Sequence, residues 1–453
     1  MRANVNRTGK KILLLSVLLF LLPLSAMHAD EDSKISEDKS QKVVHVPTKI
    51  VHGLGANKPL LPMNADNNVI PFATLDLYGT YSDANTGGDV WGAIVAGDIS
   101  PVIKLGDELY CIPLYDGSYE RQKFFAHVEE GGRIYNEKMH HDLTLSAKYL
   151  PTRKTIISPY LFGGWDFNVE TDDEEWGDGL YDYHEFGSGI DFDYIVYDLQ
   201  DERIILNSGF KWYLRHYPNF QTLISLASIT APEEDEKDFH ALEFETGWNY
   251  TRRKNLSLGL KYSLFLKFFT DKKVIDADGV LKNNKRSDVR NTLRLETYYA
   301  ANPDKGLQAN CIIEFAYNTS NQNFYDSRNT VTLTDDVYTP SYFDYLSLQI
   351  QPQLSYIFRK KDKTIAILTC GYDMTMRDYR KRLAQNAAGI YSTDEQRDYQ
   401  HIFETTISIP IDEHINWVTG YDYTINKSNM DFERYYEYNY TMHRVLTGIA
   451  INY

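Results

Sequence analysis

Ionisable side chains are the residues with the most chemistry to offer, but none of them falls into a catalytic pattern. The sequence contains no G-x-S-x-G, H-E-x-x-H, C-x-x-C or Walker-type motif. His140, His141 and Asp142 stand together. If they lie on a strand, neighbouring side chains point to opposite faces, so the two histidines would not share a ligand. We interpret them as a rim position near a loop, and we expect neither an enzyme nor a cofactor.

Two acidic stretches that contain glycine could bind cations. Clustered carboxylates beside glycine can coordinate Ca²⁺, but Asp-Gly is also ordinary turn chemistry. Neither stretch has the EF-hand spacing, so we interpret both as solvated loop tips and expect no metal site. The weak Ca²⁺ candidates are Asp172, Asp173, Glu174 and Asp178 in one stretch and Asp276 and Asp278 in the other. Three aromatic residues in or after the first stretch, Trp176, Tyr181 and Tyr183, could stack on sugars or lipopolysaccharide headgroups.

A larger set of polar residues alternates with apolar ones. Around residue 260, Leu258, Leu260 and Leu264 alternate with Lys261 and Ser263. A strand has period two, so each such run has one apolar face and one face that tolerates water. If the apolar face meets lipid, the other face lines a lumen, where charged groups set ion preference. The candidates for the lumen face are Asp142, Lys148, Asp166, Asp191, Asp193, Lys211, Glu243, Glu245, Lys261, Lys267, Arg294, Glu296, Glu314, Gln349, Gln351, Gln353, Glu404, Asp422 and Arg444.

The elements that position these residues are predicted to be long strands. Several alternating runs reach ten residues or more, whereas strands of soluble domains usually have about five or six. A strand that crosses a bilayer at a tilt needs about 9–11 residues. The predicted strands are 72–82, 90–104, 108–119, 138–150, 155–169, 185–198, 203–215, 238–252, 255–269, 287–301, 306–318, 341–359, 363–377, 398–411, 414–427 and 438–453. An extra hairpin within 121–141 would raise the count from sixteen to eighteen. Local pairing breaks are expected at Pro101, Pro159 and Pro352, because proline has no N–H to donate.

The connections between the predicted strands alternate between short and long. Short polar turns, such as 151–154 and 252–255, alternate with long acidic or Asn/Asp-rich loops. The predicted long loops are 120–137, 170–184, 216–237, 270–286, 319–340, 378–397 and 428–437. In transmembrane barrels the short turns are periplasmic and the long loops are extracellular. The pattern therefore predicts an all-β, antiparallel, up-and-down transmembrane barrel whose two ends face the periplasm.

The N-terminal residues indicate export. Four basic residues precede a short apolar run and a small-residue stretch, which is typical of a signal peptide over residues 1–29. Residues 30–70 are expected to be a periplasmic extension, partly disordered or plug-like, and residues 71–453 the barrel. The net charge of −16 argues against nucleic-acid binding. Cys111, Cys311 and Cys370 are odd in number and widely spaced, so we interpret them as apolar packing residues.

The last nine residues resemble the closing strand of bacterial outer-membrane β-barrels. Val445, Thr447, Ile449 and Ile451 share one face, and the chain stops on the aromatic Tyr453. The resemblance implies that Tyr453 is an assembly signal and that lipopolysaccharide and the barrel-assembly machinery are partners. A barrel has no edges, because every backbone polar group in hydrocarbon must be paired. The last strand should therefore pair with residues 72–82.

No single family of outer-membrane barrels is indicated. The expected function is passage of small polar solutes, or of an exported polymer, across the outer membrane. One alternative is a barrel plugged by residues 43–62 that takes up a hydrophobic ligand. A structural or adhesive role of the loops is another, and a barrel lipase or protease is the weakest. The sequence leaves the cargo and the oligomeric state open.

Overall fold

The computed structural model describes residues 69–453, except 129–130, 172, 200, 221–235, 253–254, 303–305, 327–335, 361–362 and 434–435. The predicted signal peptide, the polar tail and residues 43–62 lie outside the described residues, and those assignments stay predictions. Among the described residues, no helix is long and apolar enough to cross a membrane.

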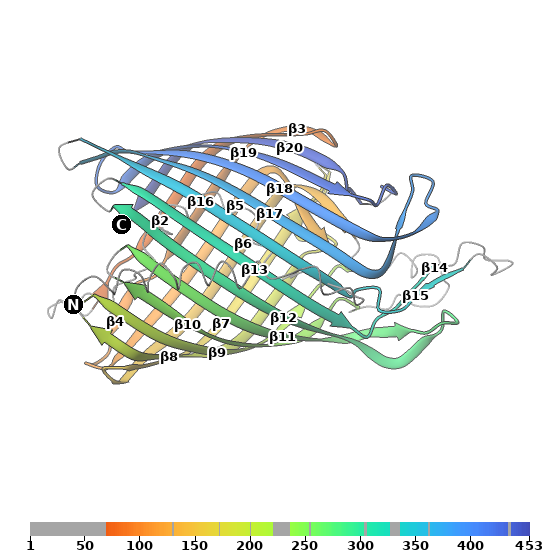
Figure 1. Ribbon diagram of the computed structural model, residues 1–453, viewed down its shortest axis with the longest axis horizontal. Helices are drawn as coiled ribbons and strands as arrows, with labels where there is room; N and C mark the ends of the chain where they lie inside the picture. Colours follow the sequence, from red (N-terminus) through yellow and green to blue (C-terminus); the bar gives the residue numbers. More distant parts are fainter. Residues whose placement is uncertain are drawn as a thin grey trace, which may run out of the picture. The chain divides into compact units, whose positions relative to one another are not determined.

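Sixteen long strands form one closed antiparallel barrel (Figure 1). They are β2 (Ala73–Ala84), β3 (Gly88–Ile99), β5 (Leu109–Val128), β6 (Gly131–Thr152), β7 (Thr155–Val169), β8 (Tyr183–Leu199), β9 (Glu202–His216), β10 (Phe239–Arg252), β11 (Leu256–Ile275), β12 (Leu281–Asn302), β13 (Leu307–Ser320), β16 (Tyr345–Lys360), β17 (Lys363–Gln385), β18 (Tyr391–Pro410), β19 (Ile415–Ser428) and β20 (Tyr440–Asn452). Four short strands accompany them: β1 (Val69–Ile70), β4 (Val102–Lys104), β14 (Phe324–Asp326) and β15 (Val337–Thr339). The predicted count of sixteen is confirmed. The eighteen-strand alternative is wrong, because residues 121–141 continue β5 and β6 instead of adding a new pair.

The barrel closes where the first long strand meets the last. β2 pairs with β20 in one unbroken register, from Thr74 opposite Asn452 to Ala84 opposite Met442. Below this ladder the Ala73 N–H donates to the Tyr453 carbonyl at 2.9 Å, and the Tyr453 N–H donates to the Ala73 carbonyl at 2.8 Å. The predicted pairing of the C-terminal strand with residues 72–82 is confirmed, and the sheet has no open edge at this seam.

The outer face of the wall is apolar and exposed. Along β2, Leu75 and Leu77 are exposed while Thr74, Asp76 and Tyr78 between them are buried. Similar exposed apolar residues continue around the barrel, among them Leu143, Leu161, Phe186, Ile190, Phe244, Leu354, Phe403 and Ile407. Apolar surface left in water is costly, so an outer face of this composition needs hydrocarbon around it.

Three predicted long loops are largely strand. Residues 120–137, 270–286 and 378–397 continue the hairpins β5–β6, β11–β12 and β17–β18, leaving connections of only a few residues. The β11–β12 and β17–β18 hairpins extend past most other strands at the right of Figure 1. Most of their exposed residues are polar, with Val280, Leu281 and Ile390 as the large apolar exceptions, so the alternation of hydrophobicity ends while backbone pairing continues. The loop assignment was therefore wrong for these three segments.

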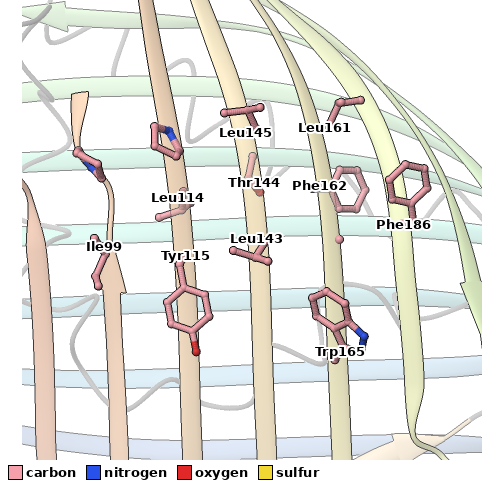
Figure 2. Close-up of a pocket in the computed structure, with 13 residues that line it drawn as sticks. Ile99, Leu114, Tyr115, Leu143, Thr144, Leu145, Leu161, Phe162, Trp165 and Phe186 are labelled. Carbon is pink, nitrogen blue, oxygen red and sulfur yellow. The ribbon is translucent and has the colours of Figure 1, made fainter. Parts of the chain in front are cut away.

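Prolines interrupt the wall where predicted. β3 ends at Ile99 and β4 begins at Val102, with Pro101 between them. Pairing of β6 with β7 skips Pro159, and pairing of β16 with β17 skips Pro352. Beside Pro101 the outer face carries a hollow of about 630 Å³, lined by outward side chains such as Leu143, Leu161 and Phe186 (Figure 2). This hollow lies on the lipid-facing side, away from the polar inner wall.

Candidate functional site: the inner wall of the barrel

The inner face of the wall carries all the residues that the sequence suggested for a lumen. Cross-strand pairing places each of them on the face opposite the exposed apolar residues, for example Lys261 opposite both Gly247 and Arg294. The Asp191 carboxylate on β8 interacts electrostatically with Asp193, Glu245, Lys261 and Lys148, which lie on β6, β8, β10 and β11. Side chains from four strands can meet in this way only if they share one face.

Ion pairs and amide contacts organise this inner face. Arg294 Nε lies 2.6 Å from Glu296 Oε1, and Arg294 Nη1 lies 3.4 Å from Glu314 Oε2. Gln349 and Gln351 both donate to Asp373 Oδ2, at 2.9 and 2.6 Å. Lys261 also forms an ion pair with Glu245. The sequence reading missed Asp373, although it shares the alternation that identified its neighbours.

Another buried ion pair lies near the closing seam. Arg444 Nε donates to Asp422 Oδ2 at 2.7 Å, and both side chains are less than a tenth exposed. Arg444 also interacts electrostatically with Glu120 and Glu404 from other strands. Arg444 therefore balances several inward carboxylates at once.

His140 lies on β6 opposite Asp166, which is three residues from the end of β7, and its assignment to a rim position near a loop stays a prediction. Its Nδ1 lies 3.2 Å from Asp166 Oδ2, and its Nε2 lies 3.1 Å from Asp142 Oδ2. Lys138 Nζ lies 2.9 Å from the same Asp166 oxygen. His141 points to the other face, where its ring meets the Tyr115 hydroxyl at 2.8 Å. Because carboxylates hold both nitrogens of His140, neither is available to accept a proton from Ser118, its cross-strand neighbour.

On one arc of the inner face, cationic side chains lie over aromatic rings. Arg215 Cζ lies 4.1 Å from the Tyr183 ring centroid, and Lys267 Nζ lies 4.2 Å from that of Phe239. These rings belong to a buried aromatic cluster that also contains Tyr213. A cation over an aromatic face is stabilised by the ring quadrupole. The cluster thus holds positive charge on the wall formed by β8 to β12.

A second arc carries acidic residues. Asp98 of β3 lies directly opposite Asp116 of β5, and Asp116 lies opposite Asp142 of β6. Carboxylates in such a cross-strand row repel one another, so the row attracts cations. The inner face therefore combines an arc on β8–β12, where cations over aromatic rings intermix with carboxylates such as Glu185 and Glu245, with an acidic row on β3, β5 and β6.

The upper part of the β5–β6 hairpin folds inward over the neighbouring strands. Thr80 Oγ1 donates to the Arg121 carbonyl at 3.0 Å, and the Lys123 N–H donates to Ser82 Oγ at 2.8 Å. The Phe125 ring stacks on Tyr440 with ring centroids 3.5 Å apart. Thr80, Ser82 and Tyr440 are all inward-facing, so residues 121–125, which we call the inner strap, cover part of the inner wall. A register shift in β5–β6 between Arg121 and Phe124 accompanies this bend.

The two acidic loops are turns whose carboxylates bond to the backbone. Asp276 Oδ1 accepts the N–H of Asp278 at 3.1 Å and that of Val280 at 2.9 Å. Glu174 Oε2 accepts the Glu170 N–H at 2.6 Å. Asp172 lies outside the described residues. Among the residues that are described, no group of three or more His, Cys, Asp or Glu side chains is arranged to hold a metal.

The end of the first acidic loop contains a buried carboxylate. Asp182 Oδ1 accepts the Asn168 N–H at 2.7 Å, and the side chain is 1 % exposed. Burial raises the pKa of Asp182 to about 6, with Asp166 and Glu174 adding to the rise and backbone N–H groups opposing it. Of the aromatic residues proposed to stack on sugars, Trp176 is exposed while Tyr181 and Tyr183 are buried.

Known proteins resemble this chain in architecture only. Its sequence matches no protein-family model and no curated protein. Its fold is similar to that of OmpT, an outer membrane protein of Vibrio cholerae, with 10% identity and a TM-score of 0.44, over 85% of this chain and 100% of that one. For OccAB3 of Acinetobacter baumannii the identity is 10% and the TM-score 0.39, over 84% of this chain and 99% of that one. For CdiB of Acinetobacter baumannii the identity is 8% and the TM-score 0.43, over 84% of this chain and 60% of that one.

The fold and its outer surface fix where the protein resides. A closed antiparallel barrel leaves no strand edge unpaired, as a membrane-spanning sheet requires. Its outer face is apolar and its inner face polar. The protein is an integral outer-membrane β-barrel.

Proposed function

We propose that the barrel is a pore for small polar solutes or for an exported polymer. The observation that carries this proposal is the number of charged inner-wall side chains that remain exposed inside a closed wall. The side chains of Lys261, Arg294 and Glu296 are 38%, 30% and 52% exposed. All three belong to ion pairs, yet a third to a half of each side chain is left open inside the wall, and water is the favourable surrounding for such partly exposed charges because desolvating a charge is costly. A wetted inner wall of this kind suits conduction.

Planar-bilayer recording of the purified full-length protein tests this proposal. We expect stepwise current in potassium chloride, with a reversal potential in a salt gradient that reports ion preference. Doubly substituting Lys261→Gln and Arg294→Gln removes two inner-wall cations and should shift that potential toward cation preference. Complete absence of current in the wild-type protein and in a chain lacking residues 43–62 would contradict a pore.

The inner strap favours a gated form of the same function. Residues 121–125 cover inward-facing Thr80, Ser82 and Tyr440, so the strap reduces the free space above them. A plug formed by residues 43–62 is the competing mode of closure. Current that appears only after deletion of 43–62 supports the plug, whereas current that rises after displacement of the strap supports gating by the strap. Turnover in a lipase or protease assay would instead support the enzyme alternative.

A further inference from the structure

We propose that Arg290 and Asn318 form an anion-binding site on the inner wall, which takes an oxyanion group, a carboxylate or a phosphate, carried by an organic solute. The proposal rests on the pore function and names the class of solute that the pore recognises.

The two residues are direct neighbours on the inner face. Arg290 of β12 lies opposite Asn318 of β13 in the register, with Phe265 of β11 on the other side of Arg290. Directly opposed residues on one face have Cβ atoms about 4.5–5.5 Å apart. Both side chains are buried, Arg290 at 5 % exposure and Asn318 at 4 %. Register and burial therefore put the two side chains beside each other on the inner face.

These donors have no protein acceptor. Arg290 Nε and Asn318 Nδ2 are buried without a hydrogen-bond partner among the described residues. Leaving a buried donor unsatisfied costs about 1–3 kcal/mol, and more for a charged group. A wall that has kept two such donors side by side is expected to satisfy them with something that binds there.

Arg290 differs from the two neighbouring inward arginines on the same strand, which both have carboxylate partners. Arg286, four residues earlier, donates to both carboxylate oxygens of Asp288, at 3.0 and 2.8 Å. Arg294, four residues later, is paired with Glu296 and Glu314. Arg290 stands between them on the same inner face and makes no ion pair within the described part of the chain. Its guanidinium instead contacts the Phe265 ring, whose centroid lies 4.8 Å from Cζ.

The donor set defines the ligand chemistry. The guanidinium of arginine donates hydrogen bonds and cannot accept any, and the asparagine NH₂ group also donates. Such a donor set suits the oxygens of a carboxylate or phosphate. The contact with Phe265 stabilises the guanidinium charge without accepting a conventional hydrogen bond from Nε, which has no partner among the described residues. Asp288, two residues from Arg290 on the same face, lies opposite Lys267 and is bonded to Arg286, so this carboxylate is balanced by cations other than Arg290.

Calorimetric titration of the folded barrel in detergent tests the site without requiring conduction. The probes are D-glucuronate, inorganic phosphate and the neutral sugar D-glucose. We expect both anions to bind more tightly than glucose, and Arg290→Gln to weaken anion binding by about tenfold or more, the effect of losing a charge-assisted hydrogen bond. The anion affinity of Arg290→Lys should lie between those of the wild type and Arg290→Gln, because lysine keeps the charge but lacks the two-pronged guanidinium.

Asn318→Asp separates a binding role from a structural one. This near-isosteric change supplies Arg290 with an internal carboxylate, so it should abolish anion binding while raising the melting temperature. Arg252→Gln is the matched control, because Arg252 lies at the opposite, periplasmic end of its strand and pairs with Glu202. It should bind both anions like the wild type.

The outcomes distinguish this inference from the pore itself. Equal affinity for glucuronate, phosphate and glucose, or unchanged anion binding in Arg290→Gln, would overturn the site even if the protein conducts. Anion binding lost in Arg290→Gln, in a protein that carries no current, would support the site and contradict the pore. Binding of glucuronate without phosphate assigns the site to carboxylates, and binding of both supports a general oxyanion site.

Discussion

Single side chains on the inner wall act in charge-balanced groups, and Arg444 belongs to one of the most deeply buried. Its guanidinium is bonded to Asp422 and interacts with Glu120 and Glu404. Removing one partner of a buried pair leaves an uncompensated charge, which costs about 3–5 kcal/mol. We therefore expect Arg444→Gln to lower the free energy of unfolding by about 3 kcal/mol in urea titrations of the barrel in lipid vesicles.

The double variant Arg444→Gln, Asp422→Asn is the control for this prediction. It removes both charges of the pair and should recover most of the lost stability. A double variant as unstable as Arg444→Gln alone would mean that Arg444 acts through packing.

Asp182 gives the extracellular side a pH-dependent contact. Its pKa of about 6 lies above the ordinary value of 3.8, so the folded protein binds the proton more tightly than the unfolded chain. The stabilising effect is present at low pH and is lost as the pH rises from about 4 through 6. Hydrogen exchange of residues 168–182, corrected for intrinsic rates, should therefore be slower at pH 5 than at pH 7. Asp182→Asn should remove this difference, and an unchanged difference would assign it to another group.

At the residue scale the sequence predicted faces but not partners. Period-two alternation was enough to put Lys261, Glu245 and Arg294 on one face, because alternation depends only on local backbone geometry. Which cation lacks a carboxylate depends on the register between strands. Arg290 meets Asn318 only because β12 and β13 pair in one particular register, and no local pattern fixes that register.

Among the elements, the inner strap depends on a close backbone approach at Gly92. A Cβ atom at Gly92 would lie 1.9 Å from the Arg121 carbonyl oxygen, so any side chain there must move the strap. We expect Gly92→Val to displace residues 121–125 and to free their backbone from the wall, so that trypsin cleaves after Arg121 and Lys123. The wild type should resist cleavage at both positions.

Gly106→Val is the matched control for the strap. A Cβ atom at Gly106 meets nothing within 4 Å, so this variant should be cleaved like the wild type. Bilayer currents of Gly92→Val then show whether a displaced strap raises conductance. Unchanged protection of Arg121 in Gly92→Val would mean that the strap does not depend on this approach.

Tyr453 has a backbone role and, in our prediction, a side-chain role that can be separated. Its backbone exchanges two hydrogen bonds with Ala73, whereas its ring is 69 % exposed and contacts His414. Tyr453→Ala keeps the backbone bonds, so the variant refolded in detergent should melt within a few degrees of the wild type. If Tyr453 is an assembly signal, the same variant should reach the outer membrane of cells in much smaller amounts. Normal amounts in that membrane would contradict the assembly role.

The elements were predictable where lipid imposes a pattern. β7 has the predicted bounds, and the seam between β2 and β20 follows from closure alone. The hairpin extensions were missed because outward residues beyond the membrane need not be apolar, so alternation disappears. The inner strap was missed because its bend depends on contacts with Thr80, Ser82 and Gly92, about thirty to forty residues earlier.

On the scale of the whole molecule, outward tryptophans should mark the two membrane interfaces. Trp91 and Trp165 lie on the extracellular halves of their strands, and Trp248 and Trp417 lie close to the periplasmic ends. Indole rings prefer the interface between hydrocarbon and water. In proteoliposomes, lipids brominated near the headgroup should quench tryptophan fluorescence more than lipids brominated at the chain end.

Trp176 lies in an extracellular loop and supplies the control for this quenching. Trp176→Phe should remove the part of the emission that aqueous iodide quenches and leave lipid quenching intact. Stronger quenching by iodide than by any brominated lipid would mean that the outer face is not in contact with lipid.

Closing the wall has a kinetic consequence. Every other junction between two long strands joins strands that follow each other along the chain, but the seam joins Thr74 to Asn452. Bringing together the ends of so long a chain costs conformational entropy that grows as the logarithm of loop length, on the order of 5 kcal/mol for several hundred residues. The other hairpins can form early and locally, whereas this contact is the slowest to form. Until the C-terminal strand arrives, the growing sheet has two unpaired edges that can template aggregation in water. Delivery of an unfolded, chaperone-shielded chain to the membrane before closure avoids that hazard.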